Sequence, residues 1–395
     1  MKKSFNTAAD CKPQIHYMVD ITQRLRQIRC MIEKGEYFVI SRGRQYGKTT
    51  TLRNLKQFLE PDYLVISMDF QKIGNERFQN ESLFSTAFTR LFLSAVRQQS
   101  AFGDEALKES VRMLESAAQG SYFGLLELFD CLSSICADSV KPVVLMIDEV
   151  DNAAGHEVFL DFLAQLRAGY IDRDITPAFQ SVILAGVYDI RNLKQKIRPE
   201  EEHKRNSPWN IASSFDIDMS FSVPDIENML EEYEQDHHTG MHTAMIAKLL
   251  HDYTSGYPFL VSRLCQILDE TITGSPACLD QTSVWTKEGV LEAVKIILSE
   301  KNTLFESLTN KLADNPKLRE LLYAALFSGD RISYNPDNDV LDIAAMYGFI
   351  KNCQGVMTVA NRIFETRLYH LFLSEDEAGA REIQAGEKCI LEIIV

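Results

Sequence analysis

Apolar residues in this chain gather in short continuous runs, separated by longer stretches with helical spacing. Four runs are nearly continuous in β-branched and other apolar residues, at positions 37–40, 63–70, 143–147 and 181–187. Runs of this kind are typical of strands buried on both faces of a parallel sheet. Between them, apolar residues recur three and four positions apart, as over 16–34 and 49–59, which predicts helices. The alternation predicts a doubly wound α/β sheet.

The pattern changes after Phe221, where strand-like runs stop and helical spacing continues to about residue 300. Two further helical segments then precede a possible hairpin with turn residues Asn352 and Gly355, and this order is typical of a winged helix. We therefore expect four parts. They are an α/β core over 1–222, a helical domain over 223–300, a winged-helix-like domain over 301–375 and a tail over 376–395.

Composition and charge exclude several classes of protein. The 395 residues are 45% hydrophobic and 25% charged, which is typical of a globular chain and not of disorder or collagen. Lys and Arg number 41 against 56 Asp and Glu, a net charge of −15, so no overall positive field attracts nucleic acid or anionic lipid. No apolar run approaches the ~20 residues that span a bilayer, and no apolar segment follows the first lysines. We expect a cytoplasmic protein with no membrane partner.

The eight cysteines form no C-x-x-C pair and are scattered through apolar surroundings. Such cysteines are typical of reduced core thiols, so we expect neither a structural disulfide nor zinc.

The most informative segment lies between the first predicted strand and the helix after it. It reads Ser41-Arg42-Gly43-Arg44-Gln45-Tyr46-Gly47-Lys48-Thr49-Thr50. Phosphate binding needs backbone N–H groups at a helix N-terminus, a lysine for the phosphate oxygens and a hydroxyl for Mg²⁺. Gly47, Lys48 and Thr49 supply these, as in a Walker A loop. The usual G-x-x-x-x-G-K-[ST] pattern has glycine where this chain has Arg42, and G-K-T alone also fits a surface turn.

A second segment, residues 141–149, is an apolar strand that ends in Asp148 and Glu149. Such a strand can bring Asp148 to a Mg²⁺ beside Thr49, while Glu149 orients or deprotonates a water. This is the pattern of Walker B. Two solvated acids at a strand end would explain this segment alone, but both motifs occur in order on the expected elements. The pair therefore favours Mg-nucleotide binding.

With both motifs in view, the chain resembles AAA-like P-loop ATPases that have an extra strand and a catalytic glutamate, related to STAND proteins and archaeal ATPases. Their first Walker A glycine is often displaced, in loops of the R-x-R-R-x-G-K-[ST] type, which residues 42–49 resemble. The likeness covers most of residues 14–372. It implies a three-layer P-loop NTPase sandwich followed by a helical lid and a winged-helix-like domain, with ATP or ADP and Mg²⁺ as cofactors.

The resemblance also implies roles for individual residues. Tyr17, and Pro258 in a Gly-Tyr-Pro element, would lie near the base, and Arg191 after the fourth strand would sense the γ-phosphate, with Arg263 a weaker candidate. The expected nucleotide-binding residues are Tyr17, Arg42, Gly43, Arg44, Gln45, Tyr46, Gly47, Lys48, Thr49, Thr50 and Pro258. The expected metal ligands are Thr49 and Asp148, and the expected catalytic residues are Lys48, Glu149 and Arg191.

We predict a slow ATPase whose nucleotide cycle moves the lid and the winged-helix-like domain, with a protein partner or self-association. One alternative is a nucleotide switch that does not hydrolyse ATP on its own, and Glu149 argues against it. Another is a DNA-binding regulator, although the helix near 337–347 carries three aspartates and no basic residue, which disfavours DNA. Some relatives carry a nuclease domain; the closing 392–394 lacks the lysine of an E-x-K motif, so we expect no nuclease activity.

Overall fold

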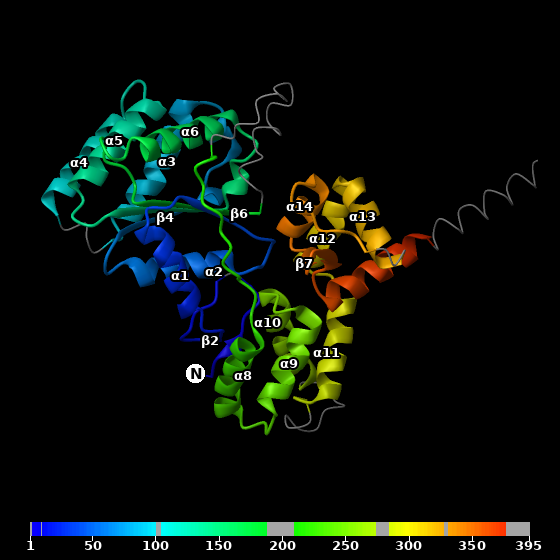
Figure 1. The fold of residues 1–395 in the computed structure, drawn as a ribbon. Coiled ribbons are helices and arrows are strands. Elements are labelled where there is room, and N and C mark those ends of the chain that lie inside the picture. Colours follow the sequence, from blue (N-terminus) through cyan, green and yellow to red (C-terminus); the bar gives the residue numbers. More distant parts are fainter. Residues whose placement is uncertain are drawn as a thin grey trace, which may run out of the picture. The chain divides into compact units, whose positions relative to one another are not determined.

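The computed structural model of the protein describes residues 2–8, 10–99, 104–187, 209–273, 284–327 and 331–376. The chain forms two compact units (Figure 1). The α/β unit comprises Asp20–Gly43 and Gly47–Met219, and the helical unit comprises Met1–Val19, Arg44–Tyr46 and Ser220–Val395. The domain boundaries expected from the sequence at 222, 300 and 375 stay predictions.

A four-stranded parallel sheet forms the centre of the α/β unit. Its order is β3 (Phe38–Ser41), β6 (Ser181–Gly186), β5 (Val143–Asp148) and β4 (Leu64–Asp69). Every residue of β5 and β6 is buried, which explains their continuous apolar runs, because a strand covered on both faces has no polar side to alternate with. The four predicted strands agree with these to within one residue at each end, and the predicted α/β fold is confirmed.

Helices cover both faces of this sheet. Figure 1 shows α1 and α2 on one face and α3, α5 and α6 on the other. The α-helices in the described part of the unit are α1 (Thr22–Glu33), α2 (Lys48–Leu59), α3 (Glu81–Val96), α4 (Glu105–Ala117), α5 (Leu125–Asp138) and α6 (Glu157–Ile171). Phe84 and Phe88 of α3 are fully buried, and their ring centroids lie 5.3 and 5.2 Å from that of Phe162 on α6. Aromatic packing thus joins α3 to α6 above the sheet.

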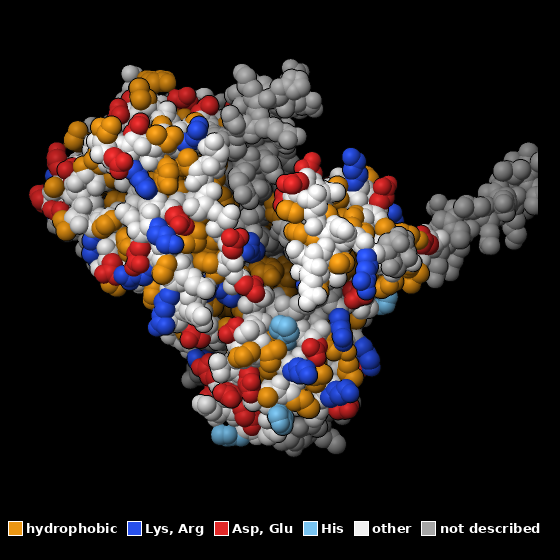
Figure 2. Space-filling view, in the orientation of Figure 1, with side chains coloured by type: hydrophobic (Ala, Val, Ile, Leu, Met, Phe, Trp, Pro, Cys, Tyr) orange, Lys and Arg blue, Asp and Glu red, His pale blue; other side chains and the backbone are white. Residues whose placement is uncertain are grey.

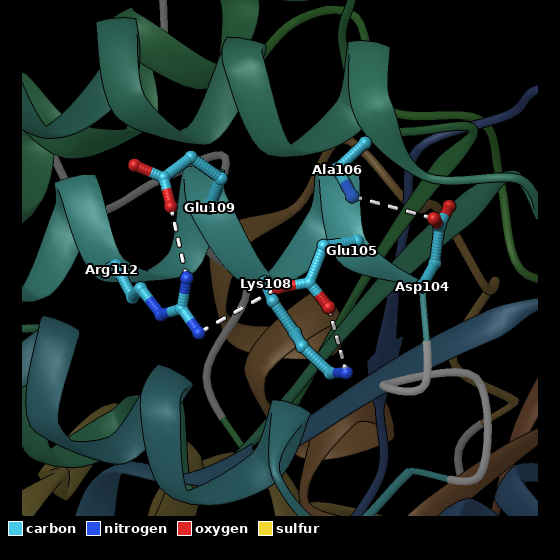
Figure 3. Close-up of polar contacts among 6 residues, drawn as sticks. All are labelled: Asp104, Glu105, Ala106, Lys108, Glu109 and Arg112. Atoms are coloured by element: carbon cyan, nitrogen blue, oxygen red, sulfur yellow. Dashed lines mark hydrogen bonds and ion pairs between the residues drawn. The ribbon is translucent and has the colours of Figure 1, made fainter.

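The exposed face of α4 carries a ladder of charge pairs (Figure 3). Lys108 and Arg112 both pair with Glu105, Arg112 also pairs with Glu109, and Asp104 caps the helix by accepting a backbone N–H. In the view of Figure 2, acidic and basic side chains are interspersed over the surface of the α/β unit. Exposed ion pairs of the α4 kind contribute only about 0.2–0.5 kcal/mol each. The helix is held chiefly by its buried face, which consists of Leu107, Ser110, Val111 and Leu114.

The helical unit begins with a short parallel pair, β1 (Ser4–Phe5) and β2 (His16–Tyr17), which pack on α10 and α8 respectively. The helices that follow are α8 (Val223–His237), α9 (Thr243–Thr254), α10 (Pro258–Gln266), α11 (Lys287–Ser299), α12 (Thr303–Asp314), α13 (Pro316–Phe327) and α14 (Asp339–Met346). An antiparallel hairpin, β7 (Ile350–Cys353) and β8 (Val356–Val359), and a helix over 362–376 are the last described elements of the unit. Within the described residues, no helix is long and apolar enough to cross a membrane.

Two local predictions are wrong. Residues 16–34 do not start as a helix, because 16–17 form β2 and the Asp20 side chain accepts the Thr22 N–H just where α1 begins. In the hairpin, the turn consists of Gln354 and Gly355, with φ of 52° and 83°, and the predicted turn residue Asn352 lies in β7. Two successive positive φ angles match the twist of a two-residue hairpin, and the Asn352 side chain accepts the Gly355 N–H at 2.8 Å.

Gly256, between α9 and α10, occupies a position that has no room for a side chain. Its φ is +72°, and a Cβ built there would lie 2.1 Å from the Phe221 carbonyl oxygen. Gly256→Ala should lower the free energy of unfolding by about 3 kcal/mol, since left-handed alanine costs about 1–2 and overpacking about 1–3 kcal/mol. Gly355→Ala is the control, because φ is +83° there but nothing lies within 4 Å of the added Cβ. Denaturant unfolding should show the larger loss for Gly256→Ala, and equal losses would contradict the steric argument.

Candidate functional site

The loop between β3 and α2 is built around glycine and an uncapped helix start. Gly47 precedes α2 with φ 81°, a left-handed conformation that favours glycine, and no side chain caps the helix. Gln45 is also left-handed, with φ 57°. The first backbone N–H groups of a helix have no partner within the helix itself, and they favour anions. The start of α2 is therefore suited to phosphate oxygens.

Lys48 lies inside the curve of this loop. Its ammonium donates to the carbonyl oxygens of Arg42 at 2.8 Å and Gly43 at 3.0 Å, and the residue is only 7% exposed. A buried ammonium is costly unless its N–H groups are hydrogen-bonded. The loop thus holds a buried positive charge beside the start of α2.

Thr49 and Asp148 join the two sequence motifs. The Thr49 hydroxyl donates to Asp148 Oδ2 at 2.7 Å, linking the first turn of α2 to the last residue of β5. Asp148 is 8% exposed, and burial raises its pKa, although the bonds from Thr49 and from the Glu149 N–H act in the opposite direction. A hydroxyl and a carboxylate oxygen are ligands that Mg²⁺ accepts in proteins. This pair fits a metal that also takes ligands from phosphate and water.

A third acid, Asp69, lies beside them and was missed by the sequence analysis. The register of β4 and β5 pairs Asp69 with Asp148, each at the end of its strand. Its charge contributes to the raised pKa of both Asp148 and Glu149. The sequence puts Asp69 near the end of an apolar run, but only the order of the strands in the sheet makes that run the neighbour of the strand that ends in Asp148.

Glu149 follows β5 in an unusual backbone conformation, with φ 53° and ψ 41°. A left-handed non-glycine residue costs about 1–2 kcal/mol, and such residues concentrate at functional sites. Burial raises the pKa of its carboxyl group, and the charge of Asp148 raises it further. The next turn is anchored by Asp151, whose Oδ2 accepts the Val187 N–H at 2.6 Å just after β6. This hydrogen bond connects the segment after β5, which contains Glu149, to the end of β6.

Residues 15–321 match the model of the AAA-like domain family. This chain belongs to that family. No curated protein matches it. Among solved structures it is similar to the Walker-type ATPase PABY2304 of Pyrococcus abyssi, with 13% identity, a TM-score of 0.59 and coverage of 92% of this chain and 99% of that one.

Two further solved structures show lower similarity. The Aeropyrum pernix ORC2 protein, in ADPNP-ADP complexes, has 11% identity and a TM-score of 0.47, over 89% of this chain and 93% of that chain. Cdc6p from Pyrobaculum aerophilum has 12% identity and a TM-score of 0.41, over 94% and 97%. At these identities the Pyrococcus structure supports the fold alone. The resemblance to AAA-like P-loop proteins is thus confirmed at the level of family and fold.

In this AAA-like sheet, β6 lies between the strand that leads to the loop and the strand that ends in Asp148. The opposite edge of β3 is covered by Ser213, which bridges Phe38 in parallel and donates its N–H to Tyr37 at 2.8 Å. Arg42, where the usual pattern has glycine, donates to the carbonyl oxygens of Phe215 and Ile217 at 3.3 and 3.1 Å. Its side chain therefore holds the segment that flanks β3.

The tip of the AAA-like loop, residues 44–46, belongs to the helical unit and is contacted there by Tyr257. The Tyr257 hydroxyl donates to the Arg44 carbonyl oxygen, and the Tyr46 ring lies edge-on to the Tyr257 ring at 4.7 Å. Gln45 donates to the Thr303 hydroxyl at 3.1 Å. Tyr257 belongs to the Gly-Tyr-Pro element, and its contact with the loop tip is not predictable from that motif.

The remaining predicted residues have other surroundings. Tyr17 is buried in the helical unit, and its hydroxyl donates to Asp236 at 2.8 Å. Pro258 is the first residue of α10 and is buried. Arg263 forms a two-bond ion pair with Glu300. Arg191 lies outside the described residues, and the nucleotide roles of Tyr17, Pro258 and Arg191 stay predictions.

Proposed function

We propose that this chain binds Mg-ATP and hydrolyses it to ADP and phosphate. The observation that carries the proposal is the hydrogen bond from Thr49 to Asp148, which joins two motifs 99 residues apart in sequence. It sets a hydroxyl and a carboxylate beside the buried ammonium of Lys48, the combination that phosphoryl transfer requires. Membership of the AAA-like family supports the same reading.

Each residue has a defined task in this proposal. The backbone N–H groups at the start of α2 hold phosphate oxygens, and Lys48 exchanges its bonds with the Arg42 and Gly43 carbonyls for bonds to phosphate. Thr49 and Asp148 hold Mg²⁺, which when bound neutralises charge on the phosphates. Glu149 accepts a proton from the attacking water, and its raised pKa makes it a stronger base than an ordinary glutamate.

We further propose that hydrolysis is coupled to movement in the helical unit. Lys48 holds the carbonyls at the base of the loop, while Tyr257 and Thr303 hold its tip. When nucleotide phosphates accept the N–H groups of Lys48, the carbonyl oxygens of Arg42 and Gly43 lose their donor. The conformation of the loop that includes residues 44–46 then changes. In this proposal α8–α11 form a lid, and α12–α14 with the β7–β8 hairpin form a winged-helix-like domain that contacts protein. Asp339 and Asp342 on α14 disfavour DNA.

The proposal is tested by measuring nucleotide binding and phosphate release on the purified chain. Labelled ATP should bind in the presence of Mg²⁺ and bind more weakly with EDTA, and excess protein should convert bound ATP to ADP in a single turnover. Binding without turnover would support the switch alternative in place of an ATPase. Absence of binding would overturn the proposal.

The raised pKa of Glu149 predicts the pH dependence of turnover. A base must be deprotonated, so hydrolysis should fall on acidification at a higher pH than for an ordinary glutamate. Asp69→Asn removes a negative charge that raises the pKa of Glu149, so in this variant the rate of hydrolysis should begin to fall at a lower pH than in wild type. Asparagine also keeps the bond that Asp69 accepts from the Gln71 N–H. Single-turnover rates from pH 5 to 8, with protein in excess of ATP but well below the concentration that saturates binding, report the free protein and measure this shift, and a shift to higher pH would contradict the assignment.

A further inference from the structure

A hollow of about 310 Å³ opens in the α/β unit beyond the end of β4. One wall comes from the turns η1 (Phe70–Lys72) and η2 (Asn75–Phe78), and the other from one face of α3. None of residues 42–50 and neither Asp148 nor Glu149 lines it. The hollow is therefore separate from the proposed nucleotide site.

Three cations surround the hollow. Lys72, Arg77 and Arg90 are exposed lining residues, and none of them is ion-paired with a residue that the structure describes. On α4, by contrast, Lys108 and Arg112 are both paired. Among the described residues that line the hollow, Glu76 is the one acid, so this lining carries two net positive charges on a chain of net charge −15. Unpaired cations gathered at one concave site favour a negatively charged ligand.

The floor of the hollow is apolar. Ile73 is 5% exposed, and Ala87 and Leu91 on α3 are half-buried lining residues. This surface favours a ligand that buries an apolar side chain on it. A free phosphate or a lone carboxylate has no such group. The ligand that fits both floor and rim therefore has an apolar group with negative charges on either side.

We propose that this hollow binds an acidic peptide segment in which one apolar side chain is flanked by Asp or Glu residues. A single-stranded nucleic acid is the other polyanion to consider. Such a strand gains most of its sequence-tolerant affinity by stacking bases on aromatic side chains, and none of the described residues that line the hollow is aromatic. The hollow sets two conditions on a ligand, which are negative charge for the exposed cations and an apolar group for Ile73, Ala87 and Leu91. A peptide meets both conditions, with carboxylates for the arginines and an aliphatic side chain for the floor.

The test is direct binding to the full chain in the absence of nucleotide, so that it does not depend on ATP binding or hydrolysis. The probe is a fluorescein-labelled peptide with one leucine between two blocks of three glutamates, followed by anisotropy at low salt. The double variant Arg77→Glu with Arg90→Glu should bind it at least ~10-fold more weakly than wild type. The double variant Arg97→Glu with Arg112→Glu is the matched control, since it reverses two exposed charges of the same unit outside the hollow and should bind like wild type.

Two further probes distinguish the kinds of ligand. A peptide with asparagine in place of leucine should bind more weakly, because asparagine gains little from the apolar floor. A single-stranded oligonucleotide of equal charge should bind no more tightly than the leucine peptide. Equal binding of the leucine peptide to wild type and the Arg77→Glu, Arg90→Glu variant would overturn the proposal, as would no binding to wild type. Tighter oligonucleotide binding that is lost in the same variant would reassign the hollow to nucleic acid. Circular dichroism melting shows that each variant is folded.

Discussion

Replacing Glu149 with glutamine should leave Mg-ATP binding within about twofold of wild type while slowing single-turnover hydrolysis by about 100-fold or more. Glutamine has the size of glutamate but cannot accept the proton of the attacking water. The Lys48 and Thr49 bonds do not involve the Glu149 side chain, so the proposed phosphate and metal ligands stay in place. Nucleotide binding measured by titration and product formation with excess protein separate the two effects.

The matched control is Glu109→Gln, which removes a carboxylate from the exposed face of α4. It should change neither binding nor turnover. If Glu149→Gln hydrolyses ATP within tenfold of wild type, another group activates the water and the role proposed for Glu149 is wrong.

Lys48→Ala should weaken ATP binding by about 100-fold or more. Charge-assisted hydrogen bonds contribute about 1.5–3 kcal/mol each, and the variant loses those that the ammonium makes to phosphate. The change also leaves the Arg42 and Gly43 carbonyls without the donor that holds them. Titration with labelled ATP in Mg²⁺ measures the loss.

Lys56→Ala, on the same helix, is its control, because Lys56 faces Glu60 rather than the loop. It should bind ATP like wild type. Thermal melting of both variants without nucleotide shows whether they are folded. An affinity for Lys48→Ala within threefold of wild type would contradict the placement of phosphate in the loop.

The four strands are predictable from sequence because burial on both faces leaves a local signal. Runs such as 143–147 and 181–187 contain only residues that a sheet covered by helices tolerates, so composition alone marks them. The ends of helices and turns that depend on a single hydrogen bond or one backbone angle are harder to predict from sequence. The start of α1 depends on the Asp20 side chain, and the hairpin turn depends on left-handed Gln354, a residue type that gives little indication of positive φ.

The two motifs of the candidate site are predictable from sequence, but not all of its residues are. Lys48, Thr49 and Asp148 were named from spacing and chemistry, and the structure brings all three together. Asp69 was missed because no motif marks a single acid at the end of an apolar run, and only the β4–β5 register sets it beside Asp148. The predicted contact of Arg42 with nucleotide stays a prediction, and the structure adds that its side chain donates to the carbonyl oxygens of Phe215 and Ile217.

The sequence by itself determined the α/β class, the order of strands and helices, the phosphate-loop and acidic motifs, and the resemblance to AAA-like proteins. These depend on residues that are close together in the chain, where periodicity and spacing are directly visible. The tertiary structure alone decided which strand ends are neighbours, what Arg42 and Tyr257 bind, and where Lys72, Arg77 and Arg90 gather around one hollow. These depend on strand order and on side chains meeting across the fold, which local sequence patterns do not encode.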